Sequence, residues 1–435
     1  MKRITADCSR VRQLAEKSGL PLTDAILKAL KKGTLQGLKP VTLLAACPNS
    51  EAVVKAAVRA AARAGSPIKF AATLNQVDLD GGYTGWRQEE FMKLVRQEVD
   101  ETGFKGPVIV ALDHGGPWLK DKQSIEGWSL EQAMKGVKDS LVACINAGYD
   151  LLHIDPTVDK TLPPGENIAV YTVVDRTVEL IAHAEGHRRR LGLPKISYEV
   201  GTEEVHGGLA DLEVFKSFLR GLNEQLAAEN LADVWPCFVV GKVGTDLHTT
   251  LFDPQVAKTL VKIAWNWGSF IKGHYTDNVS NPEDYPASGM GGANVGPEFT
   301  EAEYNSLKKL SCREEELLQQ GKLAESSGLM QALADAVVRS GRWEKWRLPE
   351  ELGKPFSELS PQRREWLVRT GCRYIWTEPD VLQAREKLYR NLSSAGIDAE
   401  SEVIENIIQV MNKYFRAFNL EDTIGRIEHE LESGL

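Results

Sequence analysis

The chain has 435 residues, of which 42% are hydrophobic and 26% charged, and 61 acidic against 52 basic side chains give a net charge of -9. A soluble chain of this size can bury a large core without disulfide or metal cross-links. The acidic balance argues against a nucleic-acid-binding protein, and the sequence has no apolar run of about 18 residues that would span a membrane. We therefore expect a soluble enzyme with neither nucleic acid nor membrane as partner.

The six cysteines form no C-x-x-C pair, and the N-terminal sequence lacks the apolar run of a signal peptide. This pattern is typical of reduced thiols in a cytoplasmic protein. We accordingly expect a cytoplasmic location and no zinc site built from cysteine.

From about Val41 the sequence alternates short apolar runs, polar turns and stretches with helical periodicity. Eight such units favour a (β/α)8 TIM barrel, because near-continuous Val, Ile and Leu runs indicate parallel strands buried on both faces. The first turn also lacks the glycine fingerprint of a dinucleotide-binding sheet. The predicted strands are Val41–Ala46, Ile68–Leu74, Pro107–Leu112, Leu151–Ile154, Ile196–Val200, Cys237–Val240, Phe270–Lys272 and Ala293–Val295.

The two ends of the chain differ from this middle part. Residues 1–38 predict an N-terminal helical segment that closes or flanks the barrel, and residues 39–300 hold the barrel and the catalytic groups. Residues 301–435 read as helices alone, rich in Glu, Arg and Trp, and predict a C-terminal extension that acts as a cap or an interaction module.

Polar residues crowd the ends of most predicted strands, where a TIM barrel carries its active site. Histidines are concentrated there, and three imidazoles from different strands suit a catalytic metal centre with one open position. The spacing favours His114, His248 and His274 as ligands of a divalent metal, although each histidine alone also fits a polar loop residue. His153 and Asp155 share one strand face and predict either substrate contacts or a buried hydrogen-bonded pair.

Four motifs stand out along the chain: Asn75-Gln76 with Gly81-Gly82-Tyr83-Thr84-Gly85, Asp113-His114-x-Gly116-Pro117, Ser197-Tyr198-x-x-Gly201-Thr202-Glu203 and Val295-Gly296-Pro297. With these motifs the sequence resembles, over most of its length, the GatZ/KbaZ-type family, the so-called non-catalytic subunits of class II tagatose-1,6-bisphosphate aldolase. More distantly, the sequence resembles the catalytic class II zinc aldolases, whose metal histidines correspond to His114, His248 and His274.

The resemblance implies a zinc-dependent barrel with Asp113 as catalytic acid/base. Glu199 stands where the catalytic aldolases carry a Glu-x-Gly, which argues for an active site, whereas their phosphate loop is replaced by Tyr275-Thr276-Asp277. We expect Asp113 or Glu199 to be the base, with its pKa raised by the site. The residues expected to bind substrate are Asn75, Gln76, His153, Asp155, Lys272, Asp277 and Asn294.

These features predict a metal-dependent C4 epimerase that interconverts fructose and tagatose, or their 6-phosphates, by breaking and re-forming the C3–C4 bond. The metal is expected to be Zn²⁺, with Mn²⁺, Co²⁺ or Ni²⁺ as alternatives. Two other hypotheses remain: a non-catalytic subunit that stabilises a catalytic aldolase, and an aldolase in its own right. The expected small-molecule partner is a ketose or ketose phosphate. The candidate protein partners are a second copy of the chain in a homo-oligomer and the catalytic aldolase subunit.

Overall fold

The computed structural model describes residues 5–163, 166–201, 210–245 and 251–434. Eight parallel strands form a closed barrel in the order β1 to β8, with β1 hydrogen-bonded to β8. The prediction of a (β/α)8 barrel is therefore confirmed. The strands are β1 Leu43–Ala46, β2 Ile68–Thr73, β3 Val108–Gly115, β4 Leu151–Ile154, β5 Ser197–Val200, β6 Phe238–Val240, β7 Phe270–Gly273 and β8 Gly292–Val295.

The predicted strands match these bounds to within one or two residues, except at the end of β3. That strand runs through Gly115, three residues beyond the predicted end at Leu112. Asp113 and His114 therefore belong to the strand itself: Asp113 pairs with Thr73 of β2, and His114 lies where the register between β3 and β4 shifts.

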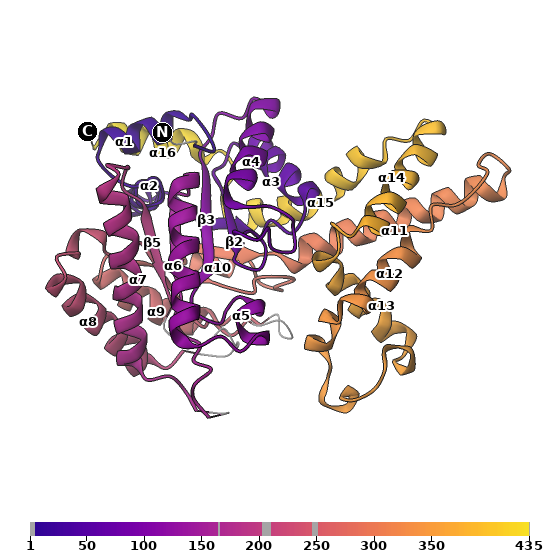
Figure 1. The fold of residues 1–435 in the computed structure, drawn as a ribbon. Coiled ribbons are helices and arrows are strands. Elements are labelled where there is room, and N and C mark those ends of the chain that lie inside the picture. The colour runs from indigo at the N-terminus through magenta and orange to yellow at the C-terminus, as the bar shows by residue number, and fades with distance from the viewer. Residues whose placement is uncertain (1–4, 164–165, 202–209, 246–250, 435) are drawn as a thin grey trace.

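Amphipathic helices surround the barrel, and their apolar faces pack on the strands (Figure 1). Local sequence sets their ends: the Ser50 side chain caps the N-terminus of α3, and Gly65, in the left-handed conformation, ends it. The helices around the barrel are α3 Glu51–Ala64, α4 Gln88–Thr102, α5 Asp121–Ile125, α6 Leu130–Ala147, α7 Val170–Arg190, α8 Leu212–Ala228, α9 Pro254–Asn266 and α10 Asp284–Ala287, with the short turn η1 Ala232–Val234.

The N-terminal segment forms α1 (Arg10–Lys17) and α2 (Leu22–Leu35). Arg12 of α1 is buried and donates hydrogen bonds to the carboxylates of Asp7 and Asp150 and to the carbonyl oxygen of Val108. Since Val108 begins β3 and Asp150 immediately precedes β4, this segment lies against the N-terminal ends of the strands, opposite the face where active sites lie in such barrels.

The C-terminal extension is helical, and it begins with α11 directly after β8. In Figure 1 α11 leads away from the barrel and α12 to α14 form a lobe beside it, before α15 returns to pack on α3. The last helix, α16, packs on α1 and α2. The elements are α11 Pro297–Gln319, α12 Leu329–Ser340, η2 Arg342–Trp346, η3 Pro349–Glu351, η4 Phe356–Glu358, α13 Pro361–Gly371, η5 Cys372–Tyr374, α14 Pro379–Ser394, α15 Ala399–Ala417 and α16 Thr423–Glu432.

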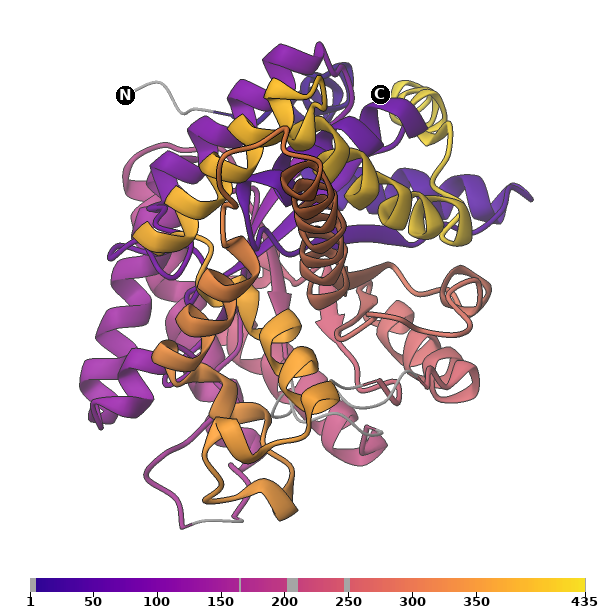
Figure 2. The ribbon, with the colours of Figure 1, turned by 90° about the vertical axis from the view of Figure 1, so that its right-hand side faces the viewer.

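Figure 2 shows this lobe from its outer side, in front of the barrel.

Among the described residues no helix combines the length and the apolar character that crossing a membrane requires.

Candidate active site

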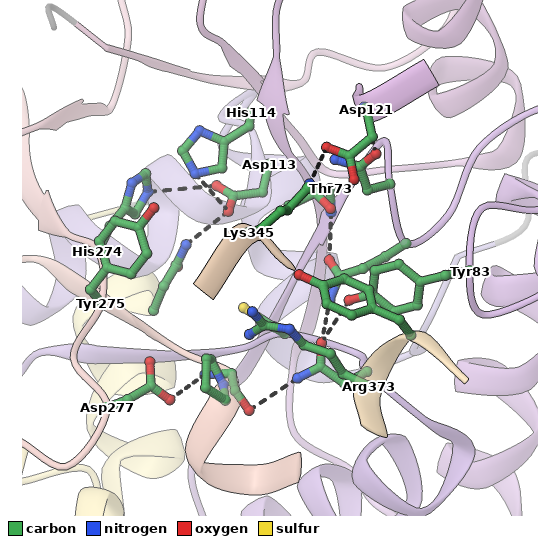
Figure 3. A pocket seen from close by; sticks show the side chains of 18 of the residues that line it. Thr73, Tyr83, Asp113, His114, Asp121, His274, Tyr275, Asp277, Lys345 and Arg373 are labelled. Atoms are coloured by element: carbon green, nitrogen blue, oxygen red, sulfur yellow. Dashed lines mark hydrogen bonds and ion pairs between the residues drawn. The ribbon is translucent and has the colours of Figure 1, made fainter. Parts of the chain in front are cut away.

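A pocket of about 250 Å³ opens at the C-terminal ends of the strands. Barrel residues form its floor and one wall, and the turns η2 and η5 of the C-terminal extension form the other wall (Figure 3). The residues that line it include Asp113, His114, His274, Asp277, Asn294 and Arg373.

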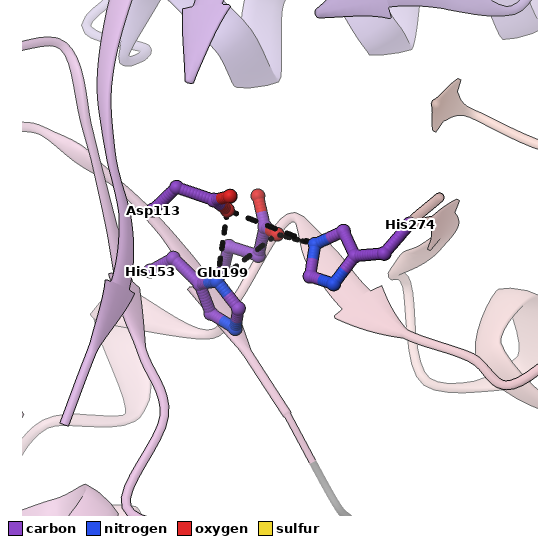
Figure 4. A group of neighbouring side chains, drawn as sticks. All are labelled: Asp113, His153, Glu199 and His274. Carbon is purple, nitrogen blue, oxygen red and sulfur yellow. Dashed lines mark hydrogen bonds and ion pairs between the residues drawn. The ribbon is translucent and has the colours of Figure 1, made fainter. Parts of the chain in front are cut away.

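Four side chains meet at the floor of this pocket and just beneath it. Asp113 and His274 line the pocket, whereas His153 and Glu199 are fully buried behind the lining. The ligand atoms that Asp113, His153, Glu199 and His274 offer all lie within 4.8 Å of one another, and all four residues are buried (Figure 4). The Nε2 atom of His274 is 3.7 Å from Oδ1 of Asp113 and 3.7 Å from Oε1 of Glu199. The barrel brings these groups together because inward-facing positions on β3, β4 and β5 and the position directly after β7 share one lumen.

Two buried lysines balance the two carboxylates. Nζ of Lys272 is 2.5 Å from Oε1 of Glu199 and 3.1 Å from Oδ1 of Asp113, while Nζ of Lys69 is 3.0 Å from Oε2 of Glu199. Lys69 lies on β2 and Glu199 on β5, which are not neighbours, so this contact crosses the barrel lumen. All four side chains are nearly inaccessible to solvent, and removal of one partner would leave an uncompensated buried charge.

The pKa values at the floor differ from the sequence-based expectation of a base with a raised pKa. Burial alone would raise the pKa of Asp113, but the ammonium of Lys272 and the nearby imidazoles hold it well below its usual range. Lys272 and Lys69 outweigh burial in the same way for Glu199, whose pKa is also lowered. Both carboxylates are therefore ionised at neutral pH, and the expectation of a raised pKa was wrong because it left out the two lysines.

His114 is held in a defined tautomer by Asp155. Its Nδ1 lies 2.6 Å from Oδ2 of Asp155, whose other oxygen accepts a hydrogen bond from the Thr157 hydroxyl at 2.6 Å. Nε2 of the same ring is 3.7 Å from Oδ2 of Asp113. Burial alone would lower the pKa of His114, but the carboxylates of Asp113 and Asp155 outweigh burial and raise it, so a metal ion at Nε2 would have to displace a proton. This carboxylate-imidazole arrangement is the one that orients metal-binding histidines in proteins.

His153 lies beneath this pair. Its Nδ1 is 3.1 Å from both the backbone nitrogen of His114 and Oδ1 of Asp113. The backbone N–H of His114 can only donate, so Nδ1 of His153 accepts this bond. The Nε2 atom of His153 is buried without a hydrogen-bond partner in the described part of the chain.

His274 supplies a further imidazole with free lone-pair capacity. Neither of its ring nitrogens has a hydrogen-bond partner among the described residues, although the side chain is buried. Burial lowers its pKa to about 4, so the ring is neutral at pH 7. Unpartnered buried nitrogens on two histidines, beside two ionised carboxylates, match the donor set of a divalent metal. The residues present therefore fit such an ion.

The remaining predicted residues have different surroundings. Asn294 lines the pocket and donates a hydrogen bond from Nδ2 to Oδ2 of Asp113 at 2.9 Å. Lys272 lies below the pocket lining with its ammonium engaged by carboxylates, so its contacts favour charge balance over substrate contact. His248 lies outside the described residues.

Asn75 and Gln76 line the pocket but use their side chains to hold loops. Nδ2 of Asn75 donates to the carbonyl oxygen of Leu119, and Gln76 binds the backbone nitrogen of Thr73 and the side chain of Asn49. The side-chain amides of Asn75 and Gln76 thus shape the pocket wall. To bind a substrate through one of these amide atoms, the residue would first have to break the hydrogen bond that this atom makes within the protein.

Asp277 carries a carboxyl group with an unusual pKa. Its Oδ1 accepts hydrogen bonds from the backbone nitrogens of Gly296 and Glu298 at the start of α11. Burial raises its pKa to about 7, with the carboxylate of Glu298 acting in the same direction. A pocket-lining group that titrates near neutrality can both accept and donate a proton.

Sequence reasoning missed the contribution of the C-terminal extension. Lys345 and Trp346 of η2 and Arg373 and Tyr374 of η5 line the pocket. No motif marks them, since their proximity to the barrel depends on how the extension folds back. Asn49 was also missed, although a polar residue directly after the first strand is a usable signal.

The profile of the D-tagatose-1,6-bisphosphate aldolase subunit GatZ/KbaZ-like family matches residues 27–424. The chain belongs to this family. The match covers the barrel and almost all of the C-terminal extension, so the lobe beside the pocket is part of what GatZ/KbaZ-like chains share with this protein.

Two solved structures resemble the fold. A probable tagatose 6 phosphate kinase from Sinorhizobium meliloti is 22% identical, with a TM-score of 0.70, and the alignment covers 86% of this chain and 100% of that one. A fructose-bisphosphate aldolase from Campylobacter jejuni is 12% identical, with a TM-score of 0.53, over 92% of this chain and 95% of that one. Because both identities are below 25%, these two structures support the fold of the chain and nothing about its activity.

Proposed function

We propose that the chain is a metal-dependent C4 epimerase of a ketohexose or ketohexose phosphate, such as fructose and tagatose or their 6-phosphates. The proposal rests on one observation, the convergence of Asp113, His153, Glu199 and His274 at the floor of an open pocket. Hydrogen at C4 is not α to the C2 carbonyl, so simple proton removal cannot invert that centre. Retro-aldol cleavage of the C3–C4 bond, followed by its re-formation on the other face of the aldehyde, inverts that centre.

The residues proposed to hold the metal are His114 and His274, with His248 as a third ligand from the sequence. The neutral ring of His274 and the Nε2 atom of His114, once deprotonated, can both coordinate a metal, and Zn²⁺ is the ion we propose first. When bound, such an ion supplies Lewis-acid stabilisation of the negative charge that develops at the C2 oxygen.

The side chains of the chain itself handle the proton. Asp113 is ionised and lines the pocket, so it can accept the proton of the C4 hydroxyl as the C3–C4 bond breaks and return it after the bond re-forms. Asn294 fixes one carboxylate oxygen and Lys272 the other, which holds the group in one orientation. In this proposal the pocket walls keep the aldehyde fragment next to the enediolate fragment while the aldehyde group rotates to present its other face.

The test is product analysis with the purified, zinc-loaded protein on fructose, tagatose and their 6-phosphates. We expect the C4 epimer of at least one substrate, and Asp113→Asn should lower kcat by about 10²-fold or more because it removes the general base. Asp80→Asn is the matched control: Asp80 pairs with Lys120 near the same end of the barrel but does not line the pocket, so its kcat should stay within about twofold. Absence of any epimer, or full activity of Asp113→Asn, contradicts the proposal.

A second candidate is a stabilising subunit of a catalytic tagatose-1,6-bisphosphate aldolase, and the family description favours it. In that case the purified chain turns over no sugar and raises the thermal stability of the partner aldolase. Metal content separates the two: stoichiometric metal that is lost in His274→Ala favours the enzyme, and metal-free protein favours the subunit. Release of a triose in a coupled assay would instead identify an aldolase.

A further inference from the structure

Arg373 is brought to the pocket by the C-terminal extension, from the turn η5 that follows α13. Its side chain lines the same pocket as Asp113 and His274, and only 8% of the residue is exposed. Figure 3 shows it across the pocket from His114. A charged group on a wall opposite the proposed reaction centre would meet the far end of a sugar chain.

The surroundings of Arg373 are mainly aromatic, and the carboxyl group of Asp277 on the same pocket acts on it from beyond ion-pair distance. The guanidinium carbon lies 5.1 Å from the ring centre of Trp346 and 4.9 Å from that of Tyr374. In the described part of the chain no carboxylate lies within 4.0 Å of its nitrogens, and Nε has no hydrogen-bond partner.

The other buried arginines of the described chain are all paired. Arg12 binds Asp7 and Asp150, Arg176 binds Asp159, and Arg188 binds Glu185. A buried guanidinium without an anion loses hydration without replacement, which is costly. Arg373 therefore differs from these residues in having its partner position open toward the pocket.

We propose that Arg373 binds an oxyanion, a phosphate or a carboxylate, on the end of the ketose that is remote from its carbonyl group. The inference rests on the proposed function only in assuming that the ketose occupies this pocket. The rings of Trp346 and Tyr374 contact the guanidinium, and the planar fork of N–H groups of an arginine suits two parallel bonds to an oxyanion. The C-terminal extension thereby supplies substrate specificity within the same chain.

The test uses three polyols that have no ketone and cannot react: glucitol 6-phosphate, gluconate and glucitol. Titration calorimetry on the full chain should show one of the two anionic polyols binding at least about tenfold more tightly than glucitol. Arg373→Met should abolish that preference while the affinity for glucitol changes less than about twofold. Arg373→Lys, which keeps the charge but not the fork, should retain part of it. The anion with the larger loss in Arg373→Met identifies phosphate or carboxylate as the natural group.

Arg342→Met is the matched control. Arg342 also stacks on Tyr374, with its guanidinium carbon 4.6 Å from the ring centre, but it pairs with Asp121 and does not line the pocket. This variant should keep the preference for the anionic polyol. Equal affinities of the unmodified chain for all three polyols, or equal losses in both arginine variants, would overturn the proposal.

The outcome is separable from that of the proposed function. An anion preference that depends on Arg373, in a protein that forms no epimer, leaves the binding site standing and removes the epimerase. Epimer formation with equal kcat/KM on neutral and anionic ketoses, unchanged in Arg373→Met, removes the binding site and leaves the epimerase.

Discussion

At the scale of single residues, the floor of the pocket is a balance of buried charges. Lys69 and Lys272 face Glu199 and Asp113, and each contact is a hydrogen-bonded ion pair in a medium of low polarity. Removing two formal charges of each sign from water is expensive, and only close pairing offsets that cost. The arrangement keeps both carboxylates ionised near neutral pH. In our proposal Asp113 is thus present in the form that accepts a proton, and its lowered pKa makes it a weaker base than a free carboxylate.

Asp277 gives a prediction for the pH dependence of stability. Its pKa of about 7 in the folded protein exceeds the ordinary value of 3.8, so the folded state binds more protons than the unfolded state between these values. The contribution of Asp277 to the free energy of unfolding should therefore fall as pH rises from about 4 to 7. In Asp277→Asn the amide oxygen can still accept the two backbone bonds, and this contribution disappears.

Urea denaturation of both proteins at pH 4 and pH 8 measures the effect. Relative to the unmodified chain, Asp277→Asn should gain roughly 2–4 kcal/mol of stability between the two pH values. Parallel stability profiles for the two proteins would show that the carboxyl group titrates normally in the folded state.

At the scale of elements, the extended end of β3 and the end of β4 carry the site together. Gly115 pairs with Ile154, and Gly116 follows at a point where an added Cβ would lie 1.7 Å from the carbonyl oxygen of Asp155. Only glycine allows this approach, which keeps Asp155 within reach of the His114 ring. The backbone at this point thus sets the orientation of an imidazole.

Gly116→Ala should destabilise the protein by about 3 kcal/mol, because the two chain segments must separate. It should also lower the metal content, since His114 loses its orientation. Gly186→Ala in α7 is the control: no atom lies within 4 Å of its added Cβ, and the change should stabilise the helix by about 0.5–1 kcal/mol. Urea denaturation and elemental analysis check both; unchanged stability and metal content in Gly116→Ala would show that the close approach has no role.

The order of elements was largely predictable from sequence, and the contacts between distant elements were not. Apolar runs such as Leu151–Ile154 marked the strands, and the polar residues Asp113 and His114 marked a strand end. A lysine inside an apolar run, as at Lys69, indicates a buried charge but not its partner on the far side of the lumen. Arg373 carried no signal, because its place depends on the path of the whole extension.

At the scale of the whole molecule, the barrel and its two flanking segments pack as one body. The extension starts at β8, forms a wall of the pocket, and returns through α15 to α3 and through α16 to α1 and α2. The N-terminal segment is fixed to the base of the barrel by the buried Arg12. Loss of that attachment should therefore weaken the whole fold.

Arg12→Met should lower the free energy of unfolding by about 3–5 kcal/mol, because it leaves the buried carboxylates of Asp7 and Asp150 without their cation. The neighbouring Arg10→Met removes an exposed pair with Glu432 and should cost less than about 1 kcal/mol. Urea denaturation of the two variants gives both values. Similar losses in the two would mean that the buried pairs contribute no more than an exposed one.

The two ends of the described chain lie side by side (Figure 1), with α1 packed against α16 on the face of the barrel opposite the pocket. A tag or surface anchor attached at either terminus therefore holds the molecule with its barrel mouth turned toward the solution. Anchored in this way, the protein can be exposed to metal ions, sugars or a partner aldolase in turn, and each can reach the pocket and the surrounding lobe without meeting the support.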